Sequence, residues 1–516
     1  MRIAKTAGGR RREDRLSTLS DATLGRILSS LPSKEAARAA LLSSRWRHVF
    51  TFVDAVWLEE PESPIAETEY EDNDGGSDYG RPDDPDPKLP FTTVLTAALL
   101  ARHGVPASPA PPLRALRVVF DRYRPEDAPA VDYWVFYAIK QADRAPAGLE
   151  LDLSLRRESL CNRLHCAGSK MHYNHMARYS VPTRLFSCAA LRTLSISIGP
   201  CSLNPPATVS LPSLEVLLVA HVCDHERHVQ ILVDGCPRLA DLTLETCATV
   251  TTLSLLGNRR LLRLALRCCH NLAKVLFAAD GKLHSLEYHG DVPDASLLGL
   301  HGGSPSFTSC SVDISAEEVS SEKLTKLGEF LQLVSSTKHL HLQSAQLGSD
   351  IQLDAPATLP VFTSLLHLEL TGRLLHDDAT AAMSRILRHT PSLEVLSMLF
   401  ETGPSDDELH ARDVWEECKE GEVVDAHQLT YNELEVLPAM PIVDIPCLRR
   451  NVREINFVHY HGGSAQRTLA RFLLCNAPVL DRLYCAFPPG PLWIQNKLRD
   501  EIQGWAMNSP INCVFD

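Results

Sequence analysis

The chain has 516 residues, too many for one ordinary hydrophobic core, so several domains or one long repeat array are expected. Apolar residues make up 44% of the sequence and aromatic residues only 6%, which favours a stacked repeat over an aromatic-rich sandwich. The 64 acidic side chains outnumber the 51 basic ones and give a net charge of −13. This balance argues against nucleic acid as the main partner.

Residues 1–13 are predicted to form a basic disordered tail, which is either simply solvated or a nuclear import signal. The tail lacks the apolar segment of a secretory signal, and runs such as Val94–Ala101 are far shorter than the roughly 20 residues that span a bilayer. The 15 cysteines show no regular framework. We therefore expect no membrane association and a reducing compartment with free thiols, cytoplasmic, nuclear or both.

Residues 14–58 are predicted to form a module of three short helices. Ser20 can cap a first helix that ends at Pro32, Ser33 can cap an alanine-rich second one, and Trp46 lies in the third. The first helix carries one apolar face with helical spacing: Leu24, Ile27, Leu28 and Leu31. Three such helices cannot bury this apolar surface alone, so the rest of the chain or another protein must cover it.

Residues 59–90 differ from the rest of the chain in composition. Between Glu59 and Lys88 there are twelve acidic residues and five prolines, against two basic side chains. A segment this charged cannot bury enough apolar surface to offset its ordering entropy. It is predicted to be an acidic disordered linker or insert, with an acidic interaction segment as the alternative.

Beyond residue 90 an L-x-x-L-x-L pattern recurs ten times. The matches are 149–155, 191–196, 214–219, 239–244, 261–266, 283–288, 365–370, 393–398, 452–457 and 480–485. Successive starts from Leu191 to Leu283 are 22 to 25 residues apart, and those at Leu365 and Leu393 are 28 apart. Periods of about 20 to 29 residues with this pattern indicate leucine-rich repeats.

Within each motif the last two leucines have a period of two, so both point inward from a short strand. Parallel stacking of these strands forms the concave wall of a solenoid. Apolar residues recur every 11 residues within 239–283, so the return path there is predicted to be extended, as at Val250–Leu255. Short helices are expected only in the 28-residue coils, for example at Ala381–His389 and Ala465–Cys475.

The solenoid is predicted to span residues 91–445, with an irregular acidic insertion near 401–445 where the leucine pattern lapses. Residues 446–516 are predicted to hold terminal repeats and a cap, because an open solenoid end must hide its last core layer.

The segment Asp14–Phe50 resembles an F-box. That family has a leucine before the first helix, an I-L-x-x-L-P run, an alanine-rich second helix and a final S-x-R-W, all matched here in order. One departure is Ser20, where the family usually has proline. The resemblance implies an interface with a Skp-type adaptor made by Leu19, Ile27, Leu28, Leu31, Pro32, Leu41 and Trp46.

The rest of the chain is similar to plant proteins that join an F-box to leucine-rich repeats. The similarity is carried by Val181–Leu194, Gly235–Thr243 and the FBD-like stretch Asn451–Cys485. It implies an α/β fold in which a short three-helix F-box module precedes a leucine-rich-repeat solenoid. Parallel strands would line the concave face, with short helices, turns and extended segments on the convex face.

The resemblance further implies a substrate-receptor subunit of an SCF-type cullin ubiquitin ligase, in which the repeats bind the protein to be ubiquitinated. The alternative is a repeat scaffold without ligase function, whose F-box has degenerated. The client footprint is expected on outward residues of the strands, namely Arg192, Glu215, Asp241, Arg263 and His284. These positions follow from strand geometry alone.

No catalytic role or cofactor is predicted for the chain. The sequence has no glycine-rich phosphate loop, no G-x-S-x-G elbow and no H-E-x-x-H motif. The densest set of soft ligands has spacing too irregular for a zinc site, so no metal is expected. That set is Cys161, His165, Cys166, His172, His175 and Cys188.

Overall fold

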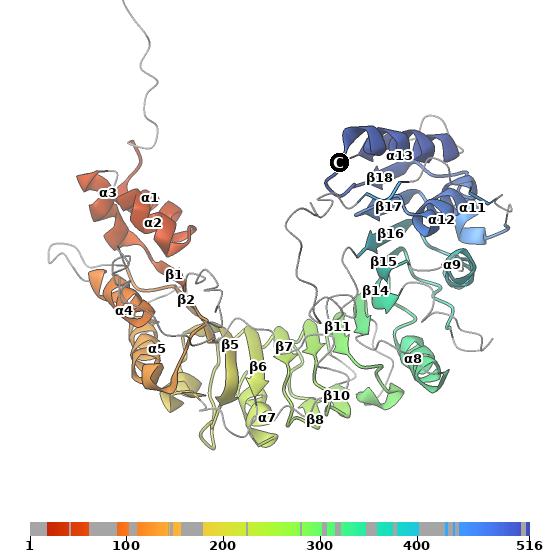
Figure 1. Cartoon of the computed structure of the whole chain (residues 1–516). Coiled ribbons are helices and arrows are strands. Elements are labelled where there is room, and N and C mark those ends of the chain that lie inside the picture. Colours follow the sequence, from red (N-terminus) through yellow and green to blue (C-terminus); the bar gives the residue numbers. More distant parts are fainter. Residues whose placement is uncertain are drawn as a thin grey trace, which may run out of the picture. The chain divides into compact units, whose positions relative to one another are not determined.

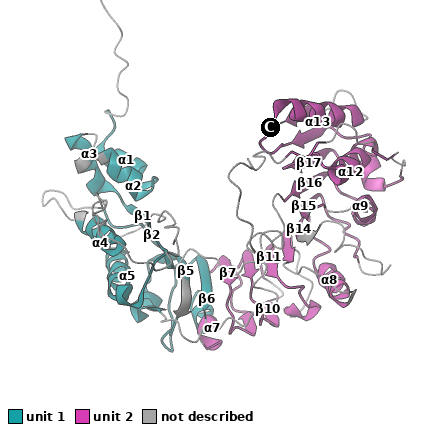
Figure 2. Cartoon of the chain, in the orientation of Figure 1, with its two compact units in different colours: residues 1–158, 173–224, 231–238 teal, residues 159–172, 225–230, 239–516 magenta. Residues whose placement is uncertain are grey.

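The computed structural model divides the chain into two compact units (Figures 1 and 2). Unit 1 holds residues 1–158, 173–224 and 231–238, and unit 2 holds residues 159–172, 225–230 and 239–516. The structure describes residues 18–40, 43–60, 90–102, 111–142, 144, 148–155, 179–222, 225–278, 281–301, 307–314, 321–346, 359–374, 379–401, 429–431, 437–438, 443–506 and 512–515. The predicted tail, nearly all of the acidic segment and most of the insertion near 401–445 lie outside these residues.

Unit 1 begins with three helices where the sequence predicts them: α1 (Asp21–Ser29), α2 (Ser33–Ala40) and α3 (Ser44–Val49), followed by the 3-10 turn η1 (Phe50–Phe52). Their shared core consists of Leu24, Leu28, Ala36, Val49 and Val53. Gly25 allows α1 to lie against η1, because a Cβ there would come within 2.6 Å of the Phe52 Cβ.

A parallel sheet follows directly, with strand order β1-β2-β3-β5-β6 and β4 paired to β5. Its strands are β1 (Ala55–Glu59), β2 (Ala115–Phe120), β3 (Leu149–Leu155), β4 (Tyr179–Ser180), β5 (Leu191–Ser202) and β6 (Val216–Val222). The helices α4 (Phe91–Ala101) and α5 (Ala128–Ala142) lie on one side of it, and η2 (Pro125–Asp127) and η4 (Thr183–Ser187) are single turns (Figure 1).

The first strand pairs across the acidic segment. Val56 of β1 lies opposite Leu116 of β2, although residues 60–114, which include the acidic segment and α4, separate the two strands in the chain. Glu59 is the last residue of β1, and Glu60 is buried and accepts hydrogen bonds from the backbone and side chain of Arg122. The three-helix module therefore continues straight into the first strand of the repeat sheet.

Unit 2 contains a parallel sheet in the order β7-β9-β11-β13-β14-β15-β16-β17-β18-β19 and a second parallel sheet β8-β10-β12. The strands of the main sheet are β7 (Asp241–Glu245), β9 (Arg263–Arg267), β11 (Ser285–Gly290), β13 (Ser309–Ile314), β14 (His339–Gln346), β15 (His367–Arg373), β16 (Val395–Phe400), β17 (Glu454–Val458), β18 (Arg482–Cys485) and β19 (Asn512–Phe515). Leucines align across coils, since Leu264 lies opposite both Leu242 and Leu286, and all three are buried.

The return path of unit 2 changes character along the chain. The short coils return through β8 (Thr252–Leu255), β10 (Lys274–Ala278) and β12 (Leu298–His301), with the turn η5 (Ala295–Leu297). Later coils return through α8 (Ser321–Leu333), α9 (Ala379–Arg388), α11 (Pro446–Arg450), α12 (Ser464–Cys475) and α13 (Leu492–Trp505). These helices lie on one side of the main sheet (Figure 1).

The predicted α/β repeat fold is confirmed, as are the extended return at 250–255 and helices close to those predicted at 381–389 and 465–475. The prediction that only 28-residue coils carry helices is wrong. The coil that begins at Leu214 contains α7 (Arg227–Asp234), whose residues are divided between the two units. Val229, Leu232 and Val233 are buried at helical spacing, which stabilises a helix even in a 25-residue coil.

Candidate binding surfaces

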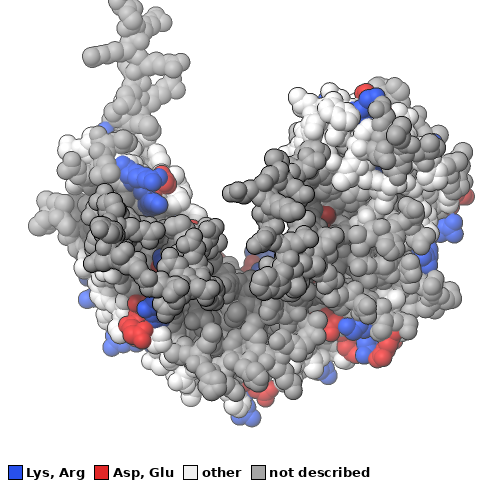
Figure 3. Space-filling view, in the orientation of Figure 1, with Lys and Arg blue, Asp and Glu red and all other residues white. Residues whose placement is uncertain are grey.

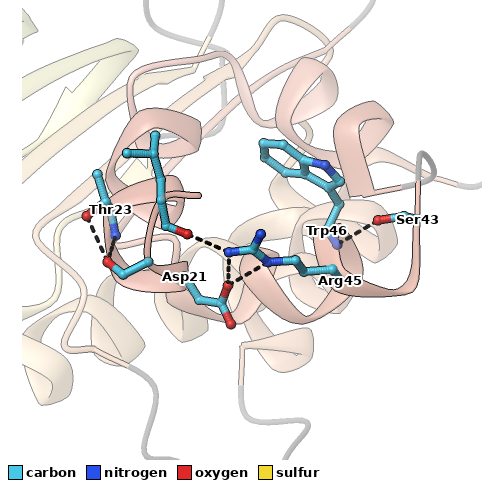
Figure 4. Close-up of polar contacts among 7 residues, drawn as sticks. Asp21, Thr23, Ser43, Arg45 and Trp46 are labelled. Atoms are coloured by element: carbon cyan, nitrogen blue, oxygen red, sulfur yellow. Dashed lines mark hydrogen bonds and ion pairs between the residues drawn. The ribbon is translucent and has the colours of Figure 1, made fainter. Parts of the chain in front are cut away.

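The three-helix module is held together by polar contacts at its edge (Figure 4). Ser20 caps α1 by accepting a hydrogen bond from the Thr23 amide at 3.2 Å. The Arg45 guanidinium donates to the Leu19 carbonyl oxygen at 2.5 Å and to the Asp21 carboxylate at 2.9 and 3.0 Å. Arg45 thus ties α3 to the first turn of α1. Ser20, where an F-box usually has proline, thus caps α1 with its side-chain oxygen.

One apolar edge of this module is exposed. Ile27 and Leu31 are four residues apart at the end of α1, and their side chains are 42% and 39% exposed. Pro32 is also exposed beside them, whereas Leu28 is 2% exposed and belongs to the core. Neighbouring apolar side chains left in solvent mark a surface that another protein can cover.

The other predicted adaptor residues differ in how far they are buried. Leu19 and Trp46 are partly buried and pack against the module core, and the Trp46 amide donates to the Ser43 hydroxyl at 3.4 Å. Leu41 lies outside the described residues. Leu28 and Trp46 therefore support the fold of the module itself, while Ile27, Leu31 and Pro32 form its outward part.

The module is fixed to the first coil by buried and partly buried hydrogen bonds. The Ser29 hydroxyl accepts from the Asp54 amide at 3.0 Å, and the Ser33 hydroxyl accepts from the Trp57 amide at 2.8 Å. Arg102, at the end of α4, is 3% exposed and donates to the carbonyl oxygens of Val53 at 3.0 Å and Pro111 at 2.7 Å. A buried guanidinium requires such partners, so Arg102 locks the end of the module to the coil.

The predicted client-binding residues lie at the starts of strands. In unit 1, Arg192 of β5 forms an ion pair with Glu215 at 3.2 Å. In unit 2, Arg263 of β9 donates to Asp241 of β7 at 2.8 Å, and His284 is exposed immediately before β11. The structure does not bring all five together in one unit, and their role in client binding stays a prediction.

A polar set that the sequence analysis missed lies on β13–β16. Here "outward" denotes strand positions that alternate with the buried core residues. The outward His341 bonds Ser311 at 3.1 Å and Thr371 at 2.9 Å, and His367 bonds Ser397 at 3.2 Å. The spacing of 28 residues from Leu340-x-Leu342 to Leu368-x-Leu370 is the signal that would have located β14.

Charges on the described surface are interspersed, with blue and red side chains adjacent in several places (Figure 3). Hydrogen bonding to Glu287 raises the pKa of Arg267, which also faces Glu245. Burial lowers the pKa of His367, although the charges of Glu369 and Glu454 act in the opposite direction. The pKa values of Arg267 and His367 are therefore shifted in opposite directions.

Two features of the described residues concern metal binding and the state of the thiols. There, no group of three or more histidine, cysteine, aspartate or glutamate residues is arranged to hold a metal ion. Of the suspected ligands only Cys188 is described, and it is buried, while the others lie in 161–175. Cys268 is disulfide-bonded, so the expectation of free thiols is wrong at that position. No described helix is long and apolar enough to cross a membrane.

Comparison with known proteins identifies similar chains in one group. A family profile described as "FBD-associated F-box protein At5g56370, LRR repeats" matches residues 166–295. In Arabidopsis thaliana, the "F-box/FBD/LRR-repeat protein At4g26340" is 28% identical over 236 residues, which are 45% of this chain and 44% of that protein. The chain thus aligns with less than half the length of that relative.

Two further Arabidopsis thaliana proteins align over more of the chain. The "F-box/LRR-repeat protein At5g35995" is 25% identical over 401 residues, 75% of this chain and 74% of the relative. The "Putative F-box protein At3g44060" is 24% identical over 390 residues, 73% of this chain and 78% of the relative.

Proposed function

The chain is similar in sequence to plant F-box proteins with leucine-rich repeats and has a parallel repeat fold, and from this premise we propose that it is a substrate receptor of an SCF-type cullin ubiquitin ligase. The helical module binds a Skp-type adaptor, and the repeat strands bind the protein to be ubiquitinated. The chain itself is non-catalytic and needs no cofactor. It acts by raising the effective concentration of client lysines near a ubiquitin-charged enzyme.

The observation that carries the proposal is the exposed apolar edge of α1. Ile27 and Leu31 are not needed by the module core, which is built from other residues. Interface energy concentrates in a few apolar anchors that become buried on binding, and these two side chains meet that description. The adaptor therefore covers the surface that the module leaves open.

The hydrogen bonds of Ser29, Ser33 and Arg102 support the same role. They join the module to the first strand of its sheet without a flexible connection. A receptor built in this way holds its docking module and its first coils at a fixed geometry, which positions a client for modification.

The test is copurification of the full chain with a Skp-type adaptor. The double variant Ile27→Ser/Leu31→Ser is expected to weaken adaptor binding by about a hundredfold, since two apolar anchors of about 1.5 kcal/mol each are lost. Leu100→Ser on α4 is the matched control, because Leu100 is 52% exposed but lies outside the module.

The alternative is a repeat scaffold whose module no longer binds an adaptor, which the departure at Ser20 would favour. Undiminished binding in the double variant would contradict the proposed interface. A folded wild-type chain that captures no adaptor would favour the scaffold. We place the protein in the cytoplasm, the nucleus or both, where such ligases act, and imaging of a tagged chain tests this.

A further inference from the structure

Helix α5 of unit 1 carries apolar side chains on two opposite faces. Its inner face is enclosed, because Trp134 and Val135 are fully buried and the Trp134 indole donates to the Thr96 hydroxyl of α4 at 3.0 Å. Only three of its 15 residues are polar or charged, so its outer face is largely apolar as well. A helix that is apolar all round is usually covered on both sides.

The outer face of α5 is open in this chain. Tyr133 and Phe136 are 37% and 44% exposed, and their spacing of three residues places them on the same side of the helix. Pro129 and Lys140, both exposed, extend the same stripe at helical spacing. The Arg184 guanidinium lies 5.3 Å from the Phe136 ring centre, yet the ring stays exposed. Neighbouring exposed aromatic side chains mark a surface for a protein partner.

The charges along this stripe change sign from one end of the helix to the other. Glu126, in the turn η2 before the helix, and Asp132 lie toward its start, whereas Lys140 and Arg144 lie toward its end. In the described part of the chain, none of these four side chains forms an ion pair. Asp132 accepts a hydrogen bond from the neutral Tyr179 hydroxyl at 2.8 Å, which leaves its negative charge uncompensated.

We infer that the outer face of α5 binds the same face of a second copy of this chain, with the two helices antiparallel around a twofold axis. Such an interface must be self-complementary, because each surface meets itself. In the antiparallel pair, Tyr133 and Phe136 of one copy contact Phe136 and Tyr133 of the other. Asp132 then lies within one helical turn of Lys140 of the second copy, because their distances from the centre of the aromatic pair differ by three residues, about 4.5 Å along the axis.

The outermost charges follow the same symmetry. Glu126 and Arg144 lie about equally far from that centre, so they also come together across the axis. Arg124 and Asp127, on either side of Glu126, have opposite charges and leave the acidic character of this end to Glu126. A parallel arrangement would instead bring like charges together, and an unrelated partner would not require charges that are complementary within one helix. The pattern therefore favours a second copy.

The contact is expected to be reversible. One helix face covers less than the roughly 800 Å² per partner of a tight interface, so we expect a Kd of about 10 µM. Two joined copies would carry two helical modules and two sets of repeats, which raises the avidity for a client with more than one binding segment. The inference goes beyond the proposed receptor role, and the self-association does not depend on adaptor binding.

The test is sedimentation velocity of the full chain, without adaptor, from about 1 to about 100 µM. The wild-type chain is expected to change from monomer to dimer across this range. Phe136→Ser is expected to weaken association about a hundredfold, because the ring is lost from both copies. Trp493→Ser on α13 is the matched control, since Trp493 is 58% exposed but lies in unit 2, and it should leave association unchanged. A chain that stays monomeric, or a dimer that Phe136→Ser leaves intact, would overturn the inference.

Charge exchange tests the antiparallel arrangement independently of the aromatic rings. Asp132→Lys alone and Lys140→Asp alone each place like charges opposite one another, so each is expected to weaken self-association about tenfold. An equal mixture of the two variants is expected to regain wild-type association, because each chain supplies the charge that the other lacks. A mixture that associates no better than the separate variants would overturn the antiparallel pairing.

The adaptor is the other candidate to cover this face, and its binding decides between the two. If the chain is monomeric and Phe136→Ser weakens adaptor binding, α5 belongs to the adaptor interface and the second copy is rejected. If Phe136→Ser abolishes self-association but leaves adaptor binding unchanged, the inference is supported. Failure of the wild-type chain to bind any adaptor would reject the receptor role and leave the self-association result to stand by itself.

Discussion

The helical module leaves apolar side chains exposed, whereas the contact layer between α12 and α13 encloses a charged side chain. The module has a core of five buried apolar residues and leaves Ile27 and Leu31 in solvent. Near the other end of the chain, even a charged residue of α12 is enclosed. Arg467 is 3% exposed, pairs with Glu501 of α13 at 2.6 Å and lies 4.9 Å from the Tyr431 ring centre.

The difference shows which residues each region can lose. A core this small depends on each member, whereas its exposed edge contributes little to folding. The α12–α13 layer depends instead on a polar pair that is costly to break. Stability measurements on single variants can sharpen or contradict this contrast.

The largest effect is expected for Leu28→Ala. Removing a fully buried leucine from the module core is expected to lower the free energy of unfolding by about 3 kcal/mol, measured by urea denaturation. Ile27→Ala, one position earlier and exposed, is expected to cost less than about 0.5 kcal/mol. Similar costs for the two variants would contradict the division between core and outward edge.

Arg467→Ala is expected to destabilise the contact between α12 and α13 by about 2 kcal/mol, because Glu501 loses its cationic partner in a partly buried site and keeps only the neutral Tyr431 hydroxyl as a donor among the described residues. Hydrogen exchange should increase in peptides covering 464–505. Arg471→Ala on the same helix is the control, since Arg471 makes an exposed hydrogen bond to the Pro438 carbonyl oxygen at 3.4 Å. Equal exchange in both variants would count against a role of the buried pair.

Ser20→Ala is expected to cost about 1 kcal/mol, because the side chain that caps α1 is lost. The measurement is the thermal stability of the module, followed by hydrogen exchange in residues 18–40. Ser20→Asp can still cap the helix and should restore most of the loss. If alanine is tolerated without change, the cap contributes nothing to this helix.

A smaller effect is expected from pH. Burial lowers the pKa of His367 in the folded chain, so the unfolded chain binds more protons near the ordinary histidine pKa of about 6.5. Stability is therefore lost as the pH falls below that value. His367→Gln should reduce the loss between about pH 7.5 and about pH 5.5, and an equal loss in both chains would contradict it.

The leucine spacing was sufficient to predict the strands of most coils, because the inward positions of a parallel repeat have a strict period. The prediction that helices occur only in 28-residue coils excluded α7, whereas burial of Val229 and Leu232 stabilises a helix in a 25-residue coil. The burial of Arg102 could not be predicted, because its partners are carbonyl oxygens that carry no sequence signal. Of the adaptor residues, sequence could not separate the exposed Ile27 from the buried Leu28.

The pairing of β1 with β2 has one further consequence, for the order of folding. The two strands determine their register through pairs such as Val56 with Leu116, yet residues 60–114, which include α4, lie between them in the chain. Closing so long a connection costs entropy before the pairing stabilises the sheet, so the three-helix module joins the sheet through a nonlocal contact.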